Sequence, residues 1–135
     1  MLTVTLTYTS RDGHGTTDRV RYAKTLDEAR AIIARAEANG KRFIEGRIDD
    51  PALVPTLRAG GFEFTTTGGP CTAFRAQPSD ECYLLITRDD DPSAPGTLGE
   101  PVTLGTYWTT PDGDALDDGT LVNFPSVTAA LDSLQ

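Results

Sequence analysis

Apolar and polar residues alternate from the start of the chain, where leucine, valine and tyrosine at the even positions 2–8 are separated by threonines. A period of two places alternate side chains on opposite faces of a strand, so residues 2–9 predict a strand with one apolar and one hydroxyl-bearing face. Residues 11–15, Arg-Asp-Gly-His-Gly, provide turn chemistry, and residues 19–22 alternate again. Together these segments predict a β-hairpin.

A helix is expected after this hairpin. Residues 25–28, Thr-Leu-Asp-Glu, have the form of a capping box, in which the threonine hydroxyl accepts a hydrogen bond from the third amide of the helix. Apolar residues then recur at helical spacing at Leu26, Ala29, Ile33 and Ala36. Asn39-Gly40 is a typical stop signal, so residues 1–40 predict a ββα unit.

The other end of the chain has a similar pattern. Residues 107–113 resemble residues 7–13 at a constant offset of 100. Residues 121–124 take the place of the return strand, Ser126 that of the helix cap, and an apolar stripe follows at Val127, Ala130, Leu131 and Leu134. Residues 102–135 therefore predict a second ββα unit. The similarity has two explanations, an internal duplication or two occurrences of a common local motif.

The middle of the chain, residues 41–88, reads mostly as strands. These are expected at residues 42–48, 62–67, 71–76 and 82–87, with a short helix that follows Asp50-Pro51 and ends at Gly60-Gly61. Residues 83–86 are apolar on both faces, which predicts a central strand covered on both sides. Residues 89–101, rich in proline and glycine, predict a long loop.

The expected fold is a single α+β domain spanning residues 1–135. It has a mostly antiparallel sheet of about seven strands, two main helices and a ββα unit at each end. No apolar run reaches the roughly 18 residues of a membrane span, and the first residues lack the features of a signal peptide. We therefore expect a cytoplasmic protein with no membrane partner.

Charge is distributed unevenly along the chain, whose net charge is −8. Up to Arg75 there are nine Asp/Glu and eleven Lys/Arg, a net charge of +2. From Ala76 onward there are eleven Asp/Glu and one cation, Arg88, a net charge of −10. Charge of one sign repels itself within a folded protein, but it raises the association rate of oppositely charged partners. This asymmetry is the main functional signal in the sequence.

Two acidic segments invite a metal-binding interpretation. The four carboxylates of residues 111–119, Asp112, Asp114, Asp117 and Asp118, resemble part of a calcium loop. The EF-hand pattern fails, however, because its fifth and sixth positions hold Leu116 and Asp117 and its twelfth holds Asn123. Adjacent carboxylates at Asp89, Asp90 and Asp91 would point in opposite directions on an extended chain. No metal site is expected.

The sequence also argues against catalysis. His14, the only histidine, lies between two glycines at an expected hairpin tip, without an orienting partner. Cys71 and Cys82 lack C-x-x-C spacing, and a turn at residues 77–80 would place Cys82 opposite Arg75, so two reduced thiols are expected. The glycine pairs at residues 60–61 and 68–69 lack the spacing of a phosphate loop. We expect neither enzymatic activity nor a cofactor.

The remaining hypothesis is an acidic inhibitor or neutralising protein that binds a basic partner, such as a nuclease or a nucleic-acid-binding complex. Immunity proteins and phage anti-defence proteins act in this way as a class, some by nucleic-acid mimicry. The expected contact residues are Asp89, Asp90, Asp91, Asp112, Asp114, Asp117, Asp118 and Trp108. Direct nucleic-acid binding is not expected, because the net charge opposes phosphate attraction unless the basic residues are well segregated on one face.

An alternative is a module that binds a small ligand or assembles with itself, for example as a homodimer. Tyr107 and Trp108 are adjacent in a predicted strand, so they cannot both face the same core. One of them is then exposed or covered by a partner. Salt distinguishes the two hypotheses, because an acidic inhibitor loses association rate as ionic strength rises and an aromatic interface does not.

Overall fold

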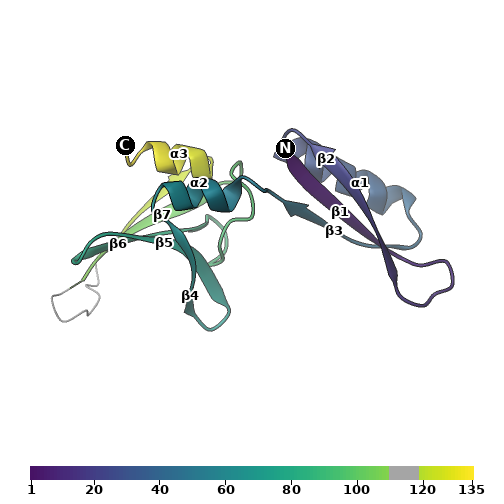
Figure 1. Ribbon diagram of the computed structural model, residues 1–135, viewed down its shortest axis with the longest axis horizontal. Helices are drawn as coiled ribbons and strands as arrows, with labels where there is room; N and C mark the ends of the chain where they lie inside the picture. Colours follow the sequence, from purple (N-terminus) through teal and green to yellow (C-terminus); the bar gives the residue numbers. More distant parts are fainter. Residues whose placement is uncertain (110–118) are drawn as a thin grey trace. The chain divides into compact units, whose positions relative to one another are not determined.

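The computed structural model describes residues 1–109 and 119–135, which form two compact units, Met1–Pro51 (unit 1) and Ala52–Gln135 (unit 2) (Figure 1). The expected α+β class is confirmed, but the single sheet of about seven strands is wrong. The described residues form two antiparallel sheets, one of three strands and one of five. The reason is that the third strand pairs back onto the first instead of joining the later strands. Each sheet then builds its own hydrophobic cluster.

Unit 1 contains β1 (Leu2–Thr9), β2 (Thr16–Ala23), α1 (Leu26–Asn39) and β3 (Phe43–Asp49). The strand order is β2-β1-β3, and all pairs are antiparallel. The alternation in β1 has the expected effect, because the apolar face packs against α1 and the threonine face does not. The buried residues of this core are Leu2, Val4, Leu6, Ala23 and Ala29.

The ends of α1 confirm the sequence signals. The Thr25 hydroxyl accepts a hydrogen bond from the Glu28 amide at 3.1 Å, and the Glu28 carboxylate accepts one from the Lys24 amide at 3.1 Å. At the other end the Gly40 amide donates to the Ala36 carbonyl at 2.8 Å. These bonds satisfy backbone groups that a helix end leaves without partners.

The β1–β2 hairpin tip contains a hydrogen-bonded carboxylate, Asp12. The Ser10 hydroxyl donates to Asp12 Oδ1 at 2.7 Å, and the His14 amide donates to the same oxygen at 2.9 Å. Gly13 and Gly15 have positive φ angles of 76° and 85°, which suits glycine in a tight turn. These two hydrogen bonds therefore stabilise the ionised form of the Asp12 side chain.

We expect Asp12 to titrate at a pKa below its ordinary value, because the Ser10 hydroxyl and then the His14 amide stabilise its charge. A depressed folded-state pKa means that these bonds support the tip at pH values above the unfolded-state pKa. The support is lost as the pH falls through the folded-state pKa. A carboxyl NMR titration measures it, and Ser10→Ala should raise the midpoint. An unchanged midpoint in that variant would contradict the assignment.

Unit 2 contains five strands and two short helices. In chain order these are α2 (Leu53–Ala59), β4 (Glu63–Gly68), β5 (Cys71–Ser79), β6 (Cys82–Arg88), β7 (Val102–Trp108), β8 (Thr120–Phe124) and α3 (Val127–Asp132). Each strand pairs antiparallel with the next, in the order β4-β5-β6-β7-β8. The central position expected for β6 is confirmed. The Ser126 hydroxyl caps α3 by accepting from the Ala129 amide at 3.0 Å, also as expected.

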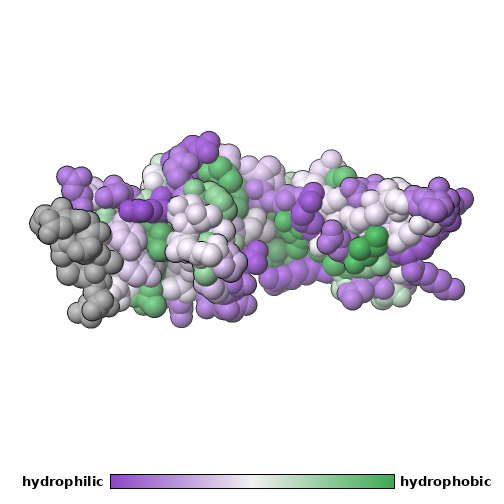
Figure 2. Space-filling view, turned by 90° about the horizontal axis from the view of Figure 1, so that it is seen from below, coloured by the Kyte–Doolittle hydropathy of each residue, from purple (hydrophilic) through white to green (hydrophobic). Residues whose placement is uncertain are grey.

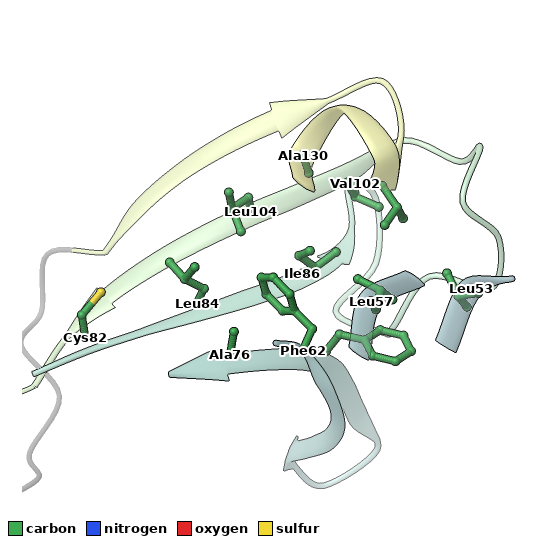
Figure 3. Packing of buried hydrophobic residues seen from close by; sticks show 12 residues of the cluster. Leu53, Leu57, Phe62, Ala76, Cys82, Leu84, Ile86, Val102, Leu104 and Ala130 are labelled. Carbon is green, nitrogen blue, oxygen red and sulfur yellow. The ribbon is translucent and has the colours of Figure 1, made fainter. Parts of the chain in front are cut away.

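The core of unit 2 lies on the side of the sheet that carries α2 and α3. Figure 3 shows Ala76 of β5, Leu84 and Ile86 of β6, and Leu104 of β7 on one side of their strands. Phe62 and Leu57 complete this layer and are almost inaccessible to solvent. The hydrophobic cluster of unit 2 therefore lies on one face of the sheet.

Two details of β6 differ from expectation. Its buried residues alternate with half-buried Tyr83, Leu85 and Thr87, so the described helices cover one face only, and coverage of both faces is wrong. The β5–β6 turn lies at residues 80–81, so Cys82 pairs with Ser79, and Arg75 with Leu85 instead of Cys82. The pairing shifts between Ala76 and Ser79, a stretch that contains Pro78, which has no amide hydrogen to donate. Cys71 and Cys82 are free thiols.

Candidate functional site

The few cations of unit 2 are already engaged. Between Ala52 and Gln135 the sequence has twelve Asp/Glu and three Lys/Arg. Arg58 Nε lies 3.3 Å from Glu63 Oε1, and Arg88 Nε lies 3.1 Å from Glu100 Oε2. The third cation, Arg75, lies over the Tyr83 ring at 4.6 Å from its centroid. Among the acidic residues of unit 2 that the structure describes, only Glu63 and Glu100 form an ion pair with one of these cations.

Asp89, Asp90 and Asp91 are exposed at the start of the loop that follows β6. The loop is held in place: the Arg88 amide donates to the Ser93 carbonyl at 2.9 Å. Further along, the Glu100 carboxylate accepts hydrogen bonds from the amides of Gly96 and Thr97. The three aspartate side chains themselves make no hydrogen bond or ion pair with any described residue. They are free to meet a partner.

Trp108 lies at the opposite end of β6, where it ends β7 and pairs with Cys82. Its exposed fraction is 49%, which confirms that one of the two adjacent aromatic residues is exposed. The next residue, Thr109, donates from its amide to the Glu81 carbonyl at 2.8 Å and from its hydroxyl to the Asp80 carbonyl at 3.2 Å. The exposed indole therefore lies at the end of the sheet that carries the acidic turn at residues 80–81.

The structure does not bring all the expected contact residues together. Residues 89–91 and Trp108 lie at opposite ends of the seven-residue β6, about 20 Å apart at the usual rise of a strand. Asp112, Asp114, Asp117 and Asp118 lie outside the described residues, so their part in a contact face stays a prediction. Within the described part, unit 2 offers two separate acidic ends instead of one continuous face.

The open face of the larger sheet carries an aromatic stack that the sequence pattern did not indicate. Tyr83 and Tyr107 stack with ring centroids 5.1 Å apart and an interplanar angle of 15°. Gly105 makes room for this stack, because a Cβ there would lie 2.6 Å from Tyr107 Cε2. Thr65, Arg75, Tyr83 and Leu85 help to line a hollow of about 360 Å³. Residues 83–86 of β6 are all apolar, so their pattern does not show which side of the strand faces the core. Only the pairing of β6 with β5 and β7 identifies the open face.

The sequence candidates for metal binding and catalysis can be placed where they fall within the described residues. No group of three or more potential metal-binding side chains occurs within residues 1–109 and 119–135. His14 lies exposed in the hairpin tip, where its backbone contributes to the turn. None of the helices that the structure describes is long and apolar enough to cross a membrane. No protein-family model, curated protein or solved structure matches this chain.

Proposed function

We propose that this protein is a non-catalytic binding protein whose unit 2 docks onto a basic protein and inhibits or neutralises it. One observation carries the proposal: the net negative charge of the chain belongs to one of its two compact structural units. Unit 1 has nine Lys/Arg and eight Asp/Glu, a net charge of +1. Unit 2 has three Lys/Arg and twelve Asp/Glu, a net charge of −9, and the two values sum to −8.

The physical basis is electrostatic steering followed by anchoring. A surface of one sign raises the association rate of an oppositely charged partner by roughly 10- to 1,000-fold. Carboxylates can occupy the positions that phosphates take on a nuclease or another nucleic-acid-binding protein, which defines the class of partner. Exposed tryptophan is a favoured anchor at interfaces, and Trp108 supports the acidic end at residues 80–81 as the anchoring end.

The test is affinity capture from a lysate of the source organism with three full-length baits. These are the unchanged protein, the neutralised variant Asp89→Asn/Asp90→Asn/Asp91→Asn and the control variant Asp27→Asn/Glu37→Gln/Glu45→Gln. The control removes the same charge from exposed positions of unit 1. We expect the unchanged protein to retain a basic protein at about 0.01 M ionic strength and less of it at about 0.15 M.

Recovery of this partner should fall about tenfold with the neutralised variant and change little with the control, because only the first alters the acidic unit. Trp108→Ala should reduce recovery at both ionic strengths, since it removes an anchor and no charge. The activity of the purified partner, measured with and without this protein, then tests inhibition. Equal recovery with both charge variants, or recovery that salt does not change, would contradict the proposal.

The aromatic face of unit 2 favours a second candidate function, the binding of a small ligand. Its hollow of about 360 Å³ is within the range of small-molecule sites and combines hydroxyl groups, a guanidinium and a tyrosine ring. This function would not depend on the exposed aspartates. If small-ligand binding is the function, the affinity capture should retain no basic protein. Binding of the small ligand in the hollow should persist at high salt.

A further inference from the structure

Unit 1 contains a groove whose charged residues all have the same sign. It consists of two adjoining hollows of about 430 and 520 Å³ that share Tyr8, Arg19, Asn39 and Gly40. Six cations line them: Arg11, Arg19, Arg21, Arg35, Lys41 and Arg42. No Asp or Glu contributes to either lining. Strongly hydrophilic residues gather at the end of unit 1 that carries the β1–β2 hairpin, at the right of Figure 2.

This groove is formed by segments that are separate in the sequence. Arg19 and Arg21 lie opposite Leu6 and Val4 of β1, on the face of edge strand β2 that is turned toward α1. Arg35 comes from the second half of α1. The loop after the helix contributes two more cations, and the hairpin contributes Arg11. Packing of α1 on the sheet thus gathers the cations.

The cations of the groove form no ion pair with any residue that the structure describes. The ion pairs within the described part of the chain are Arg47–Asp49, Arg58–Glu63 and Arg88–Glu100, and none includes a groove residue. Arg19 lies over the Tyr8 ring at 5.3 Å from its centroid, which orients a guanidinium without neutralising it. The nearby acid Asp18 lies on the opposite face of β2, where its carboxylate accepts a hydrogen bond from the Thr7 hydroxyl.

Two structural roles of these cations explain only part of the pattern. Charges on an edge strand oppose unwanted strand pairing, and cations near a helix C-terminus complement its dipole. Acidic as well as basic residues can protect an edge strand. The dipole at a helix C-terminus corresponds to only about half a unit charge, so six cations are not needed to complement it. Unit 1 is almost balanced, with nine Lys/Arg and eight Asp/Glu, so its composition does not require a groove with six cations and no acid.

We propose that this groove binds the phosphodiester backbone of single-stranded nucleic acid. Six cations spread over several segments suit a ligand with negative charges along its length better than a single anion. A concave site with side chains on both walls suits one strand better than a duplex. Hydroxyl and amide groups of Ser10, Thr17 and Asn39 add hydrogen-bonding partners for phosphate and sugar oxygens.

The lining of the groove also predicts how strongly binding would depend on the base sequence of the strand. Tyr8 is the only aromatic residue in the lining, and its ring already contacts Arg19 and, edge to face, Phe43. Little aromatic surface is left for stacking of bases, so binding should depend on charge and have weak sequence preference. The expectation against direct nucleic-acid binding rested on the net charge of the whole chain. The segregation of cations in one groove removes that premise, and the inference does not depend on the proposed role of unit 2.

The test uses the full-length chain and a fluorescent oligothymidylate of about 16 nucleotides, with binding measured by anisotropy. We expect saturable binding at about 50 mM salt and much weaker binding at about 200 mM. If most of the six cations meet phosphates, the slope of log affinity against log salt should lie near −3 to −4, at about −0.7 per phosphate. A duplex of the same length should bind less tightly, and inorganic phosphate at millimolar concentration should not displace the strand.

The groove variant Arg35→Glu/Arg42→Glu should weaken binding at about 50 mM salt by at least about tenfold. The control Lys24→Glu/Arg30→Glu makes the same charge change at exposed positions of unit 1 outside the groove and should have a much smaller effect. The milder Arg35→Gln/Arg42→Gln provides a second variant if charge reversal disturbs folding. Equal weakening by groove and control variants, no binding at about 50 mM salt, or tighter binding of duplex or phosphate would overturn the proposal.

Discussion

Replacing Phe62 by alanine should destabilise unit 2 by about 3–5 kcal/mol and leave unit 1 folded. Phe62 is 1% exposed, and its side chain lies in the cluster between the sheet and the two helices of unit 2 (Figure 3). Removing the ring leaves a cavity that the surrounding strands can fill only in part. Small domains have a total stability of about 5–15 kcal/mol, so a large share is lost.

Trp108 makes this result measurable, because the only tryptophan of the chain belongs to unit 2. Denaturant unfolding followed by tryptophan fluorescence should show a lower midpoint for Phe62→Ala. Amide NMR signals of β1 should stay in place under conditions that unfold the variant's unit 2, because the core of unit 1 is built from other residues. Phe64→Ala is the matched control: this ring is 59% exposed, and its loss should cost about 1 kcal/mol or less.

The outcome also decides whether the expected single domain of residues 1–135 is correct. Two compact units with separate hydrophobic clusters predict two transitions. If the β1 signals of unit 1 disappear together with the Trp108 transition in Phe62→Ala, the chain unfolds as one cooperative domain. The separate-unit interpretation would then be wrong.

Gly46→Ala should destabilise unit 1 by about 1–3 kcal/mol through overpacking. Gly46 lies on β3 beneath α1, and a Cβ at this position would lie 2.6 Å from Ile33 Cγ1 and within 2.9 Å of two further Ile33 atoms. The β-branched isoleucine has few rotamers with which to avoid the contact. Thermal unfolding followed by far-ultraviolet circular dichroism, or by NMR of unit 1, gives the loss in stability.

A double-mutant cycle tests the stated cause. Ile33→Ala removes the atoms that the new methyl group would meet, so Gly46→Ala should cost less in the Ile33→Ala background than in the unchanged protein. Glu45→Ala, a change at the exposed neighbouring position, should have a small effect. Additive losses in the cycle would show that close packing against Ile33 is not the cause.

Much of the secondary structure could be predicted because its signals are local. Alternation over residues 2–9 and the glycines after it were sufficient for the first hairpin. Thr25 and Ser126 identified two helix starts, since each cap bonds an amide three residues along the chain. The irregular stretch at residues 89–101 followed from its prolines and glycines. Each of these inferences needs only residues that are close in sequence.

The arrangement of the sheets could not be predicted in this way. The pattern of β3 is compatible with pairing to β1 or to the central strands, and only the observed register selects β1. Gly46 is one residue that reflects the pairing of β3 with β1. It could not be interpreted from the sequence, because the need for glycine at this position is evident only once α1 is known to pass over β3. The predicted β5–β6 register was wrong for a related reason. The pairing shifts between residues 76 and 79, and this shift changes which residues of the two strands lie opposite one another beyond it.

The candidate sites also combine features that local sequence predicts with features that depend on strand pairing and helix docking. Sequence alone determined the helices, most strands, the total charge and its concentration in the second part of the chain, because these depend on neighbouring residues or on counting. Tertiary structure decided that there are two sheets, that Trp108 and Asp89 lie at opposite ends of β6, and that cations from β2, α1 and two loops meet in one groove. The physical reason is that strand pairing and helix docking join residues far apart in the chain, and no local pattern encodes which partner is chosen.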